Sequence, residues 1–175
     1  MMSSPAAPYQ RHTTSNPYED KFGYSRAVRK GNHIIVSGTT AVSKPEFVGA
    51  SSPSSAAAAA LAAAAASSSP SSKAAAQQRL GRDDDEIKVL HPESAYLQAL
   101  VVFKEALSAV EALGGKKEDV VNVRMYVRDK GDSGEVGRAM RECLGDVGPA
   151  ATMILGVGFV HEDMRVEVEL AAITD

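Results

Sequence analysis

Two spacings of apolar side chains separate the expected helices of this chain from its expected strands. Between Pro92 and Leu113 apolar residues recur every three or four positions, which predicts an amphipathic helix that ends at Gly114-Gly115. The same spacing predicts a second helix from Ser133 to Leu144. From Asp119 to Asp129 the period changes to two, which predicts a strand with one aliphatic and one polar face. The aliphatic face is predicted to hold Val121, Val123, Met125 and Val127.

Four further strands complete the expected pattern. Tyr24 to Arg29 and His33 to Thr39 are predicted to pair through a Gly-Asn turn. Ala150 to Phe159 and Arg165 to Ile173 are predicted to form a final hairpin. This order predicts an α+β fold in which a mixed sheet carries two helices packed on one face. The other sheet face is polar, so it is either solvated or packed against neighbouring subunits.

Composition divides the chain into an arm, one domain and an insertion. Residues 1–21 are rich in Ser, Pro and Thr and are expected to form a flexible N-terminal arm. Residues 22–175 are expected to form a single domain, interrupted at about 44–86 by a low-complexity insertion rich in Ala and Ser. The insertion offers almost no apolar packing surface, so the core must come from the rest of the chain.

Charge and cysteine usage narrow the classes of partner. The chain has 19 Lys and Arg against 22 Asp and Glu, and it has no basic stripe, so no nucleic-acid partner is expected. No apolar run approaches the ~20 residues of a membrane span. The single cysteine, Cys143, excludes an internal disulfide and indicates a cytoplasmic location. The four histidines lack the paired spacing of metal ligands, so neither a metal nor another cofactor is expected.

Three motifs, in this order along the chain, carry a resemblance to a known family. The first is YxxxVxxGNxxxxSG from Tyr24 to Gly38, the second is the DVVxVxxYVxD strand, and the third runs from Pro149-Ala150-x-Thr152 to Val-Glu-Val-Glu at 166–169. Over residues 22–42 and 87–174 the chain resembles the Rid/YjgF family, also labelled the endoribonuclease L-PSP family. The resemblance implies a chorismate-mutase-like fold, a homotrimer, and clefts between subunits that bind small molecules.

The resemblance also implies a catalytic pair with one gap. Deaminating members of the family carry a tyrosine near the first strand, an arginine after Pro-Ala and a glutamate on the last strand. Tyr24 and Glu167 match the tyrosine and the glutamate, so Glu167 is expected to orient water and Tyr24 to close the pocket. Ala151 replaces the arginine, which removes a charge-assisted contact worth about 1.5–3 kcal/mol. This loss argues against standard deamination of 2-imino acids.

Other polar residues are candidate ligand contacts, and more than one function stays open. The hydroxyls of Ser37 and Thr152 are expected to hold the ligand, and Arg26, Arg124 or Arg128 could supply a substitute cation. The expected function is binding of a small metabolite between subunits, with hydrolysis of an imine, an enamine or a related C–N bond. The alternative is a non-catalytic ligand-binding or chaperone-like trimer. Endoribonuclease activity is a third hypothesis, which the acidic balance disfavours.

Overall fold

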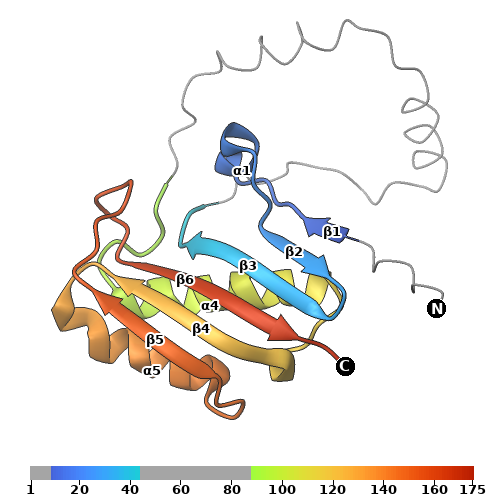
Figure 1. The fold of residues 1–175 in the computed structure, drawn as a ribbon. Coiled ribbons are helices and arrows are strands. Elements are labelled where there is room, and N and C mark those ends of the chain that lie inside the picture. Colours follow the sequence, from blue (N-terminus) through green and yellow to red (C-terminus); the bar gives the residue numbers. More distant parts are fainter. Residues whose placement is uncertain (1–8, 44–87) are drawn as a thin grey trace, which may run out of the picture. The chain divides into compact units, whose positions relative to one another are not determined.

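The computed structural model describes residues 9–43 and 88–175, and in them six strands form one mixed sheet (Figure 1). The strands are β1 (Tyr9–His12), β2 (Ala27–Lys30), β3 (His33–Thr40), β4 (Val120–Val127), β5 (Ala150–Leu155) and β6 (Val166–Ile173). Their order across the sheet is β1-β2-β3-β6-β4-β5. All neighbours are antiparallel except β4 and β5, which are parallel. The low-complexity insertion expected at about 44–86 lies outside the described residues.

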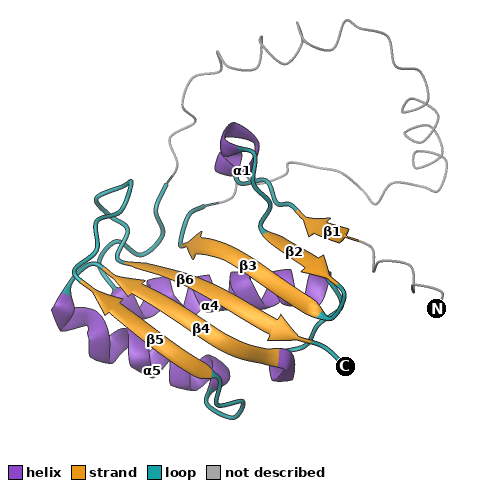
Figure 2. Ribbon diagram, in the orientation of Figure 1, coloured by secondary structure: helices purple, strands orange, loops and turns teal. Residues whose placement is uncertain are grey.

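Two long helices cover one face of this sheet, as the periodicity predicted (Figure 2). They are α4 (Ala95–Ala112) and α5 (Ser133–Leu144), and a shorter helix, α1 (Pro17–Phe22), lies near the N-terminus. The Ser94 side chain caps α4 by accepting a hydrogen bond from the Leu97 N–H. Short 3₁₀ turns at Lys117–Asp119 and Lys130–Asp132 lead into β4 and α5. The α+β class with helices on one face is therefore confirmed.

The core lies between the sheet and the two long helices. Its buried strand residues come from β2, β3, β4 and β6, and its helical residues come from α4 and α5, including the fully buried Phe103. The largest buried residues include Ile34, Val36, Val102, Phe103, Val110, Val123, Val127, Val136, Leu144 and Leu170. A one-sided core leaves the opposite sheet face uncovered by the described part of the chain.

The predicted final hairpin was wrong. β5 lies at the edge of the sheet and is parallel to β4, whereas β6 lies in the centre between β3 and β4. The cause is the β4-α5-β5 unit, because a helical crossover returns the chain parallel to the strand that it left. Residues 156–165 then carry the chain from the edge to the gap in the centre, where the aliphatic face of β6 is buried.

A β-bulge changes the start of β4. The register against β6 shifts between Val120 and Asn122, and two residues there occupy the space of one. Val120 is consequently buried, while Val121 is 42% exposed. Strict alternation had placed Val121 on the aliphatic face, and that assignment was wrong for this residue.

The N-terminal segment holds ordered elements where a flexible arm was expected. β1 pairs with β2, and α1 begins after Asn16, whose Oδ1 accepts a hydrogen bond from the Tyr18 N–H at 3.0 Å. Gly23 ends α1 with a φ of 72°, a conformation that favours glycine. β1 is largely exposed, so its sequence carries no hydrophobic signal that could have predicted it. The strand expected from Tyr24 begins only at Ala27.

Candidate functional site

The uncovered face of the sheet carries the polar side chains of β4 and β6. Val166, Val168 and Leu170 are buried against the helices, so the alternate residues Glu167 and Glu169 point to the other face. Glu167 is in register with Thr40 on one side and with Tyr126 on the other. Glu169 is in register with Arg124, which is in register with Thr152 on β5. Two rows of polar residues therefore cross the open face.

The carboxylate of Glu167 lies directly against the backbone of Gly38. A Cβ atom on Gly38 would overlap Oε1 of Glu167, so only glycine leaves room for the carboxylate in this position. Among the described residues, none makes a hydrogen bond or an ion pair to this carboxylate. Burial raises the pKa of the Glu167 carboxyl above its usual value, Glu169 raises it further, and Arg26 lowers it. This half-buried, unpaired carboxylate is the strongest candidate for chemistry.

Arg26 lies next to this position and is almost fully buried, with 4% exposure. Its Nε donates to Oε1 of Glu19 at 3.1 Å, and its Nη1 donates to the Gly38 carbonyl and to Oγ1 of Thr39, both at 2.8 Å. Its Nη2 donates to the Tyr24 hydroxyl at 3.4 Å. These contacts connect Tyr24 with the residue under Glu167. They also engage Arg26 inside the chain, so it lacks the free donor pair that a carboxylate clamp needs.

The other predicted ligand contacts are spread over the strands. The Ser37 hydroxyl donates to the Ser25 carbonyl at 2.8 Å and so connects β3 to the segment before β2. Arg124 is exposed, and its Nη1 lies 3.3 Å from Oε2 of Glu169. Thr152 is exposed in the same row, on the edge strand. The structure thus groups Tyr24 with Glu167 around Arg26, while Arg124 and Thr152 lie one row away.

The position of the missing arginine lies on the opposite face of the sheet. Ala151 is in register with Val123, which is fully buried under the helices, so the Ala151 side chain points to the helix-covered face. Glu167 points to the open face. One chain therefore cannot place the side chain of residue 151 and the Glu167 carboxylate in a common cleft. The motifs alone did not reveal this separation, because it depends on the register of β5.

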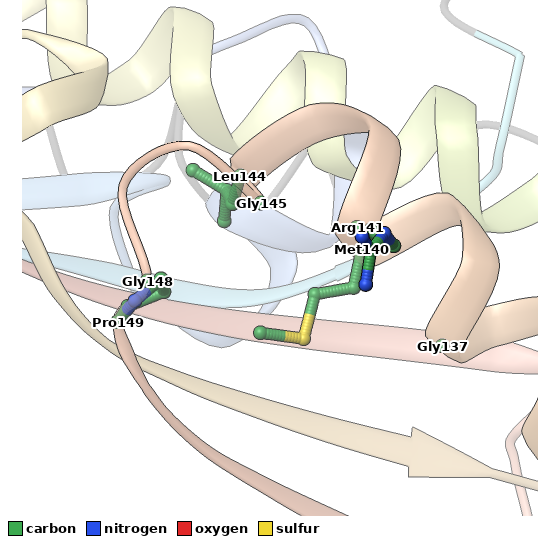
Figure 3. A pocket seen from close by; sticks show the side chains of 7 residues that line it. All are labelled: Gly137, Met140, Arg141, Leu144, Gly145, Gly148 and Pro149. Atoms are coloured by element: carbon green, nitrogen blue, oxygen red, sulfur yellow. The ribbon is translucent and has the colours of Figure 1, made fainter.

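A surface groove lies on the helix-covered side, next to the start of β5 (Figure 3). Its volume is about 450 Å³, within the range of small-molecule pockets. It is lined by Gly137, Met140, Arg141, Leu144, Gly145, Gly148 and Pro149. In Figure 3 the Met140 side chain extends from α5 toward Gly148 and Pro149. This groove lies on the helix-covered side and the Glu167 carboxylate on the open face, so within one chain they do not form a common site.

Sequence reasoning missed Arg141, the one cation that lines this groove. No hydrogen bond or ion pair connects its guanidinium to another described residue. Arg141 follows Met140 on α5, and the spacing of apolar residues in that helix predicts only which side packs against the core. Arg141 becomes a candidate only when α5 is known to lie close to Gly148 and Pro149, and this proximity depends on the crossover connection.

The described residues offer neither a metal site nor a membrane span. Residues 9–43 and 88–175 contain no group of three or more His, Cys, Asp or Glu side chains that could hold a metal ion. No helix in these ranges has the length and apolar character needed to span a bilayer.

The fold, with two helices on one face of a six-stranded mixed sheet, is shared with solved structures of the YjgF type. Residues 78–174 match the model of the family described as Endoribonuclease L-PSP, and this chain belongs to that family. The match covers more than half of the chain. It begins after the block from Tyr24 to Gly38, whose resemblance to the family rests on the motif residues and on the fold.

A relative and two solved structures are similar to this chain over most of its length. An uncharacterized protein of Streptomyces coelicolor is 26% identical over 163 residues, which cover 93% of this chain and 90% of the relative. A member of the YjgF/YER057c/UK114 family from Mycobacterium tuberculosis superposes with a TM-score of 0.63 at 22% identity, covering 95% of this chain and all of the other. A member of the YjgF protein family from Neisseria meningitidis gives a TM-score of 0.60 at 17% identity, with 98% of both chains covered. These structures share the fold.

Proposed function

We propose that this protein forms a homotrimer that binds a small metabolite between subunits and hydrolyses an imine, an enamine or a related C–N bond. The observation that carries the proposal is the Glu167 carboxylate, which lies against Gly38 without a hydrogen-bond partner among the described residues. A carboxylate left unpaired in a half-buried position is available to a water molecule or a ligand. Membership of the family supports a function of this class.

The proposed chemistry needs one residue that moves protons. In imine hydrolysis water adds to the carbon of the C=N bond, the nitrogen gains protons, and the C–N bond breaks to give a carbonyl compound and ammonia. Glu167 accepts a proton from the attacking water and returns it to the leaving nitrogen. A general acid–base catalyst works best when its pKa is near the working pH, and burial and Glu169 both raise the pKa of Glu167 in that direction. Tyr24 closes the pocket beside it.

The groove and the Glu167 carboxylate lie on opposite sides of the sheet, which supports a site formed between two copies of this chain. Ala151 and the groove lie on the helix-covered side, while Glu167 lies on the open face. Ile154 and Leu155 on the edge strand β5 are 41% and 40% exposed, which is unusual for large apolar residues on both faces of one strand. A second copy packed at this edge would cover them and bring its own Glu167 toward the groove.

The protein is therefore expected to be a trimer in solution. Sedimentation equilibrium at micromolar concentration should return three times the chain mass of 18.4 kDa. A variant with Ile154→Lys should dissociate, because a charged side chain cannot be buried cheaply at an interface. Lys130→Glu, a change at an exposed residue, serves as the control. A monomeric wild-type mass would remove the basis for a shared cleft.

The activity is tested by ammonia release from imines that a second enzyme generates in the assay. We expect release from imines without a carboxylate, made by an amine oxidase, and weak release from 2-imino acids, because Ala151 offers no guanidinium. Glu167→Gln should abolish release, and the acid limb of the pH profile should lie above the ordinary pKa of glutamate, in keeping with the raised pKa of Glu167. Glu111→Gln, at an exposed position on α4, is the control. Unchanged release by Glu167→Gln would refute the assignment.

Restoring the missing cation gives a second test of the same site. Ala151→Arg is expected to increase turnover of 2-imino acids about ten- to hundred-fold, since one carboxylate contact contributes about 1.5–3 kcal/mol. Ala150→Arg is the control, because Ala150 is in register with Asn122 and belongs to the other row of the strand. The two kcat/KM values measure the effect. Equal values for the two variants would mean that the cleft does not use this position.

A non-catalytic ligand-binding or chaperone-like trimer is the second candidate. The observation in its favour is Ala151, because a protein that only binds its ligand no longer needs the substrate clamp. A folded trimer that binds metabolites in a thermal-shift screen but releases no ammonia from any imine would support it. Endoribonuclease activity remains the least favoured hypothesis, since the net charge is −3.

A further inference from the structure

One ion pair in the described residues is buried at both ends. The side chains of Arg26 and Glu19 are 5% and 4% exposed, and Nε of Arg26 lies 3.1 Å from Oε1 of Glu19. At least one partner is clearly more accessible in every other Lys or Arg pair, such as Lys117–Asp146 at 34% and 67% exposure. A pair removed from water is costly to assemble unless its remaining lone pairs and protons are satisfied. In this chain they are largely satisfied.

Glu19 receives three donors, so its carboxylate is held from several directions. The Thr14 N–H donates to Oε2 at 2.6 Å, and the Thr14 hydroxyl donates to Oε1 at 2.7 Å. Arg26 supplies the third. Glu19 thereby joins the loop before α1 to the residue that precedes β2. The segment expected to be a flexible arm is held in place by this carboxylate.

Arg26 continues the network to the candidate site. Its Nη1 donates to the Gly38 carbonyl and to Oγ1 of Thr39, and Thr39 Oγ1 in turn donates to the Ser37 carbonyl at 2.8 Å. Gly38 is the residue on which the Glu167 carboxylate lies. The guanidinium also lies 5.7 Å from the centre of the Tyr24 ring. One buried cation thus contacts both the support of Glu167 and the side chain of Tyr24.

We propose that the Glu19–Arg26 pair is a positioning element of the candidate site. It fixes the N-terminal segment so that Tyr24 lies beside Glu167, and Glu19 partly neutralises the cation whose field Glu167 experiences. The role in catalysis rests on the proposed function, whereas the positioning and the field do not.

Removing the charge of Glu19 and removing the charge of Arg26 are expected to shift the pKa of Glu167 in opposite directions. Arg26 lowers the pKa of Glu167, while Glu169 on the same strand raises it. Arg124 on β4 is paired with Glu169. Tyr126 on the same strand is neutral near pH 7, because the ordinary pKa of tyrosine is about 10 and burial raises the pKa of Tyr126 further. Removing the charge of Glu19 leaves Arg26 less neutralised and should lower the pKa of Glu167. Removing the charge of Arg26 should raise that pKa.

The experiment is a carbon-detected NMR titration of the Glu167 carboxyl in the full chain. Glu19→Gln should shift the midpoint to lower pH, and Arg26→Met should shift it to higher pH. Arg29→Met is the matched control: Arg29 is half-buried on β2 and donates to the carbonyls of Gly31 and Leu113 and to Oγ1 of Thr174. It should lower the melting temperature and leave the Glu167 midpoint unchanged.

Two further variants keep the test informative if a single charge removal prevents folding. The double change Glu19→Met with Arg26→Met removes the pair as a whole, which proteins tolerate better than a lone buried charge. Its Glu167 midpoint should lie above that of the wild type. Thr14→Val keeps the backbone donor and loses only the hydroxyl contact, so it should increase exchange broadening of the Tyr24 ring signals with little change in the midpoint.

The outcomes separate this proposal from the proposed function. Midpoints that move in the same direction in Glu19→Gln and Arg26→Met, or that do not move in folded protein, would overturn the positioning role. Opposite shifts establish it even if no imine is hydrolysed, because the titration needs no turnover. Opposite shifts together with ammonia release that falls at least tenfold in Thr14→Val would extend the role to catalysis.

Discussion

Replacing Gly38 by alanine is expected to reduce ammonia release about 10²- to 10⁴-fold while the protein stays folded. The new Cβ would occupy the place of Oε1 of Glu167, and a carboxylate at the end of a flexible side chain moves away more easily than a backbone does. Oε1 of Glu167 is then displaced although both residues of the proposed catalytic pair remain. The kcat of the purified protein, measured with the imine that the wild type hydrolyses best, checks the effect.

The control for this variant is another glycine with free space around it. Nothing lies within 4 Å of a Cβ built on Gly158, so Gly158→Ala should keep the wild-type kcat. Thermal unfolding of both variants should stay close to that of the wild type. If Gly38→Ala retained full activity, the Glu167 carboxylate would not need its place over the β3 backbone, and its catalytic assignment would fail.

Replacing Gln98 by leucine is expected to destabilise the protein by about 2–4 kcal/mol, since it leaves two backbone groups without partners. Gln98 is fully buried on α4; its Nε2 donates to the Asp163 carbonyl and its Oε1 accepts from the Arg165 N–H, both at 2.8 Å. Leucine has nearly the same size, so the loss is one of hydrogen bonds and not of packing. Equilibrium urea unfolding at a fixed protein concentration measures it.

The control is Leu97→Gln, the reverse substitution at the neighbouring residue. Leu97 is 37% exposed, and Leu97→Gln should change the free energy of unfolding by less than about 0.5 kcal/mol. A Gln98→Leu variant as stable as the wild type would mean that water replaces the amide in holding residues 156–165. The same segment leads into β6 and Glu167, so amide hydrogen exchange at Arg165 should speed up in the variant.

The periodicity of apolar residues predicted those helices and strands that bury one face in the core. α5 has the predicted bounds Ser133–Leu144, and β4 lies within the predicted Asp119 to Asp129, because each has one apolar side that packs into the core. β1 has no buried side and left no pattern. Pairing was not predictable in the same way: the aliphatic face of β6 fits a hairpin and a central strand equally well, and the crossover through α5 decides between them.

The sequence predicted which residues belong to the candidate site, but it did not predict how their side chains are arranged. The motifs identified Glu167 and Tyr24, and the structure groups them around Arg26. Nothing in the motifs reveals that Arg26 is engaged by Glu19, because that contact depends on how α1 packs. The opposite orientation of residue 151 follows from the register of β5 with β4, which a sequence pattern of period two cannot supply.

The contact between Thr14 and Glu19 has a practical consequence for producing shortened forms of this protein. A fragment cut at residue 22, where the region of family resemblance begins, would retain Arg26 and lose its acidic partner. The guanidinium would then be a buried cation without its acidic partner, which is expected to destabilise the fragment. Expression of a shortened form should therefore start before Thr14, and an affinity tag is better attached upstream of β1 than next to the first motif.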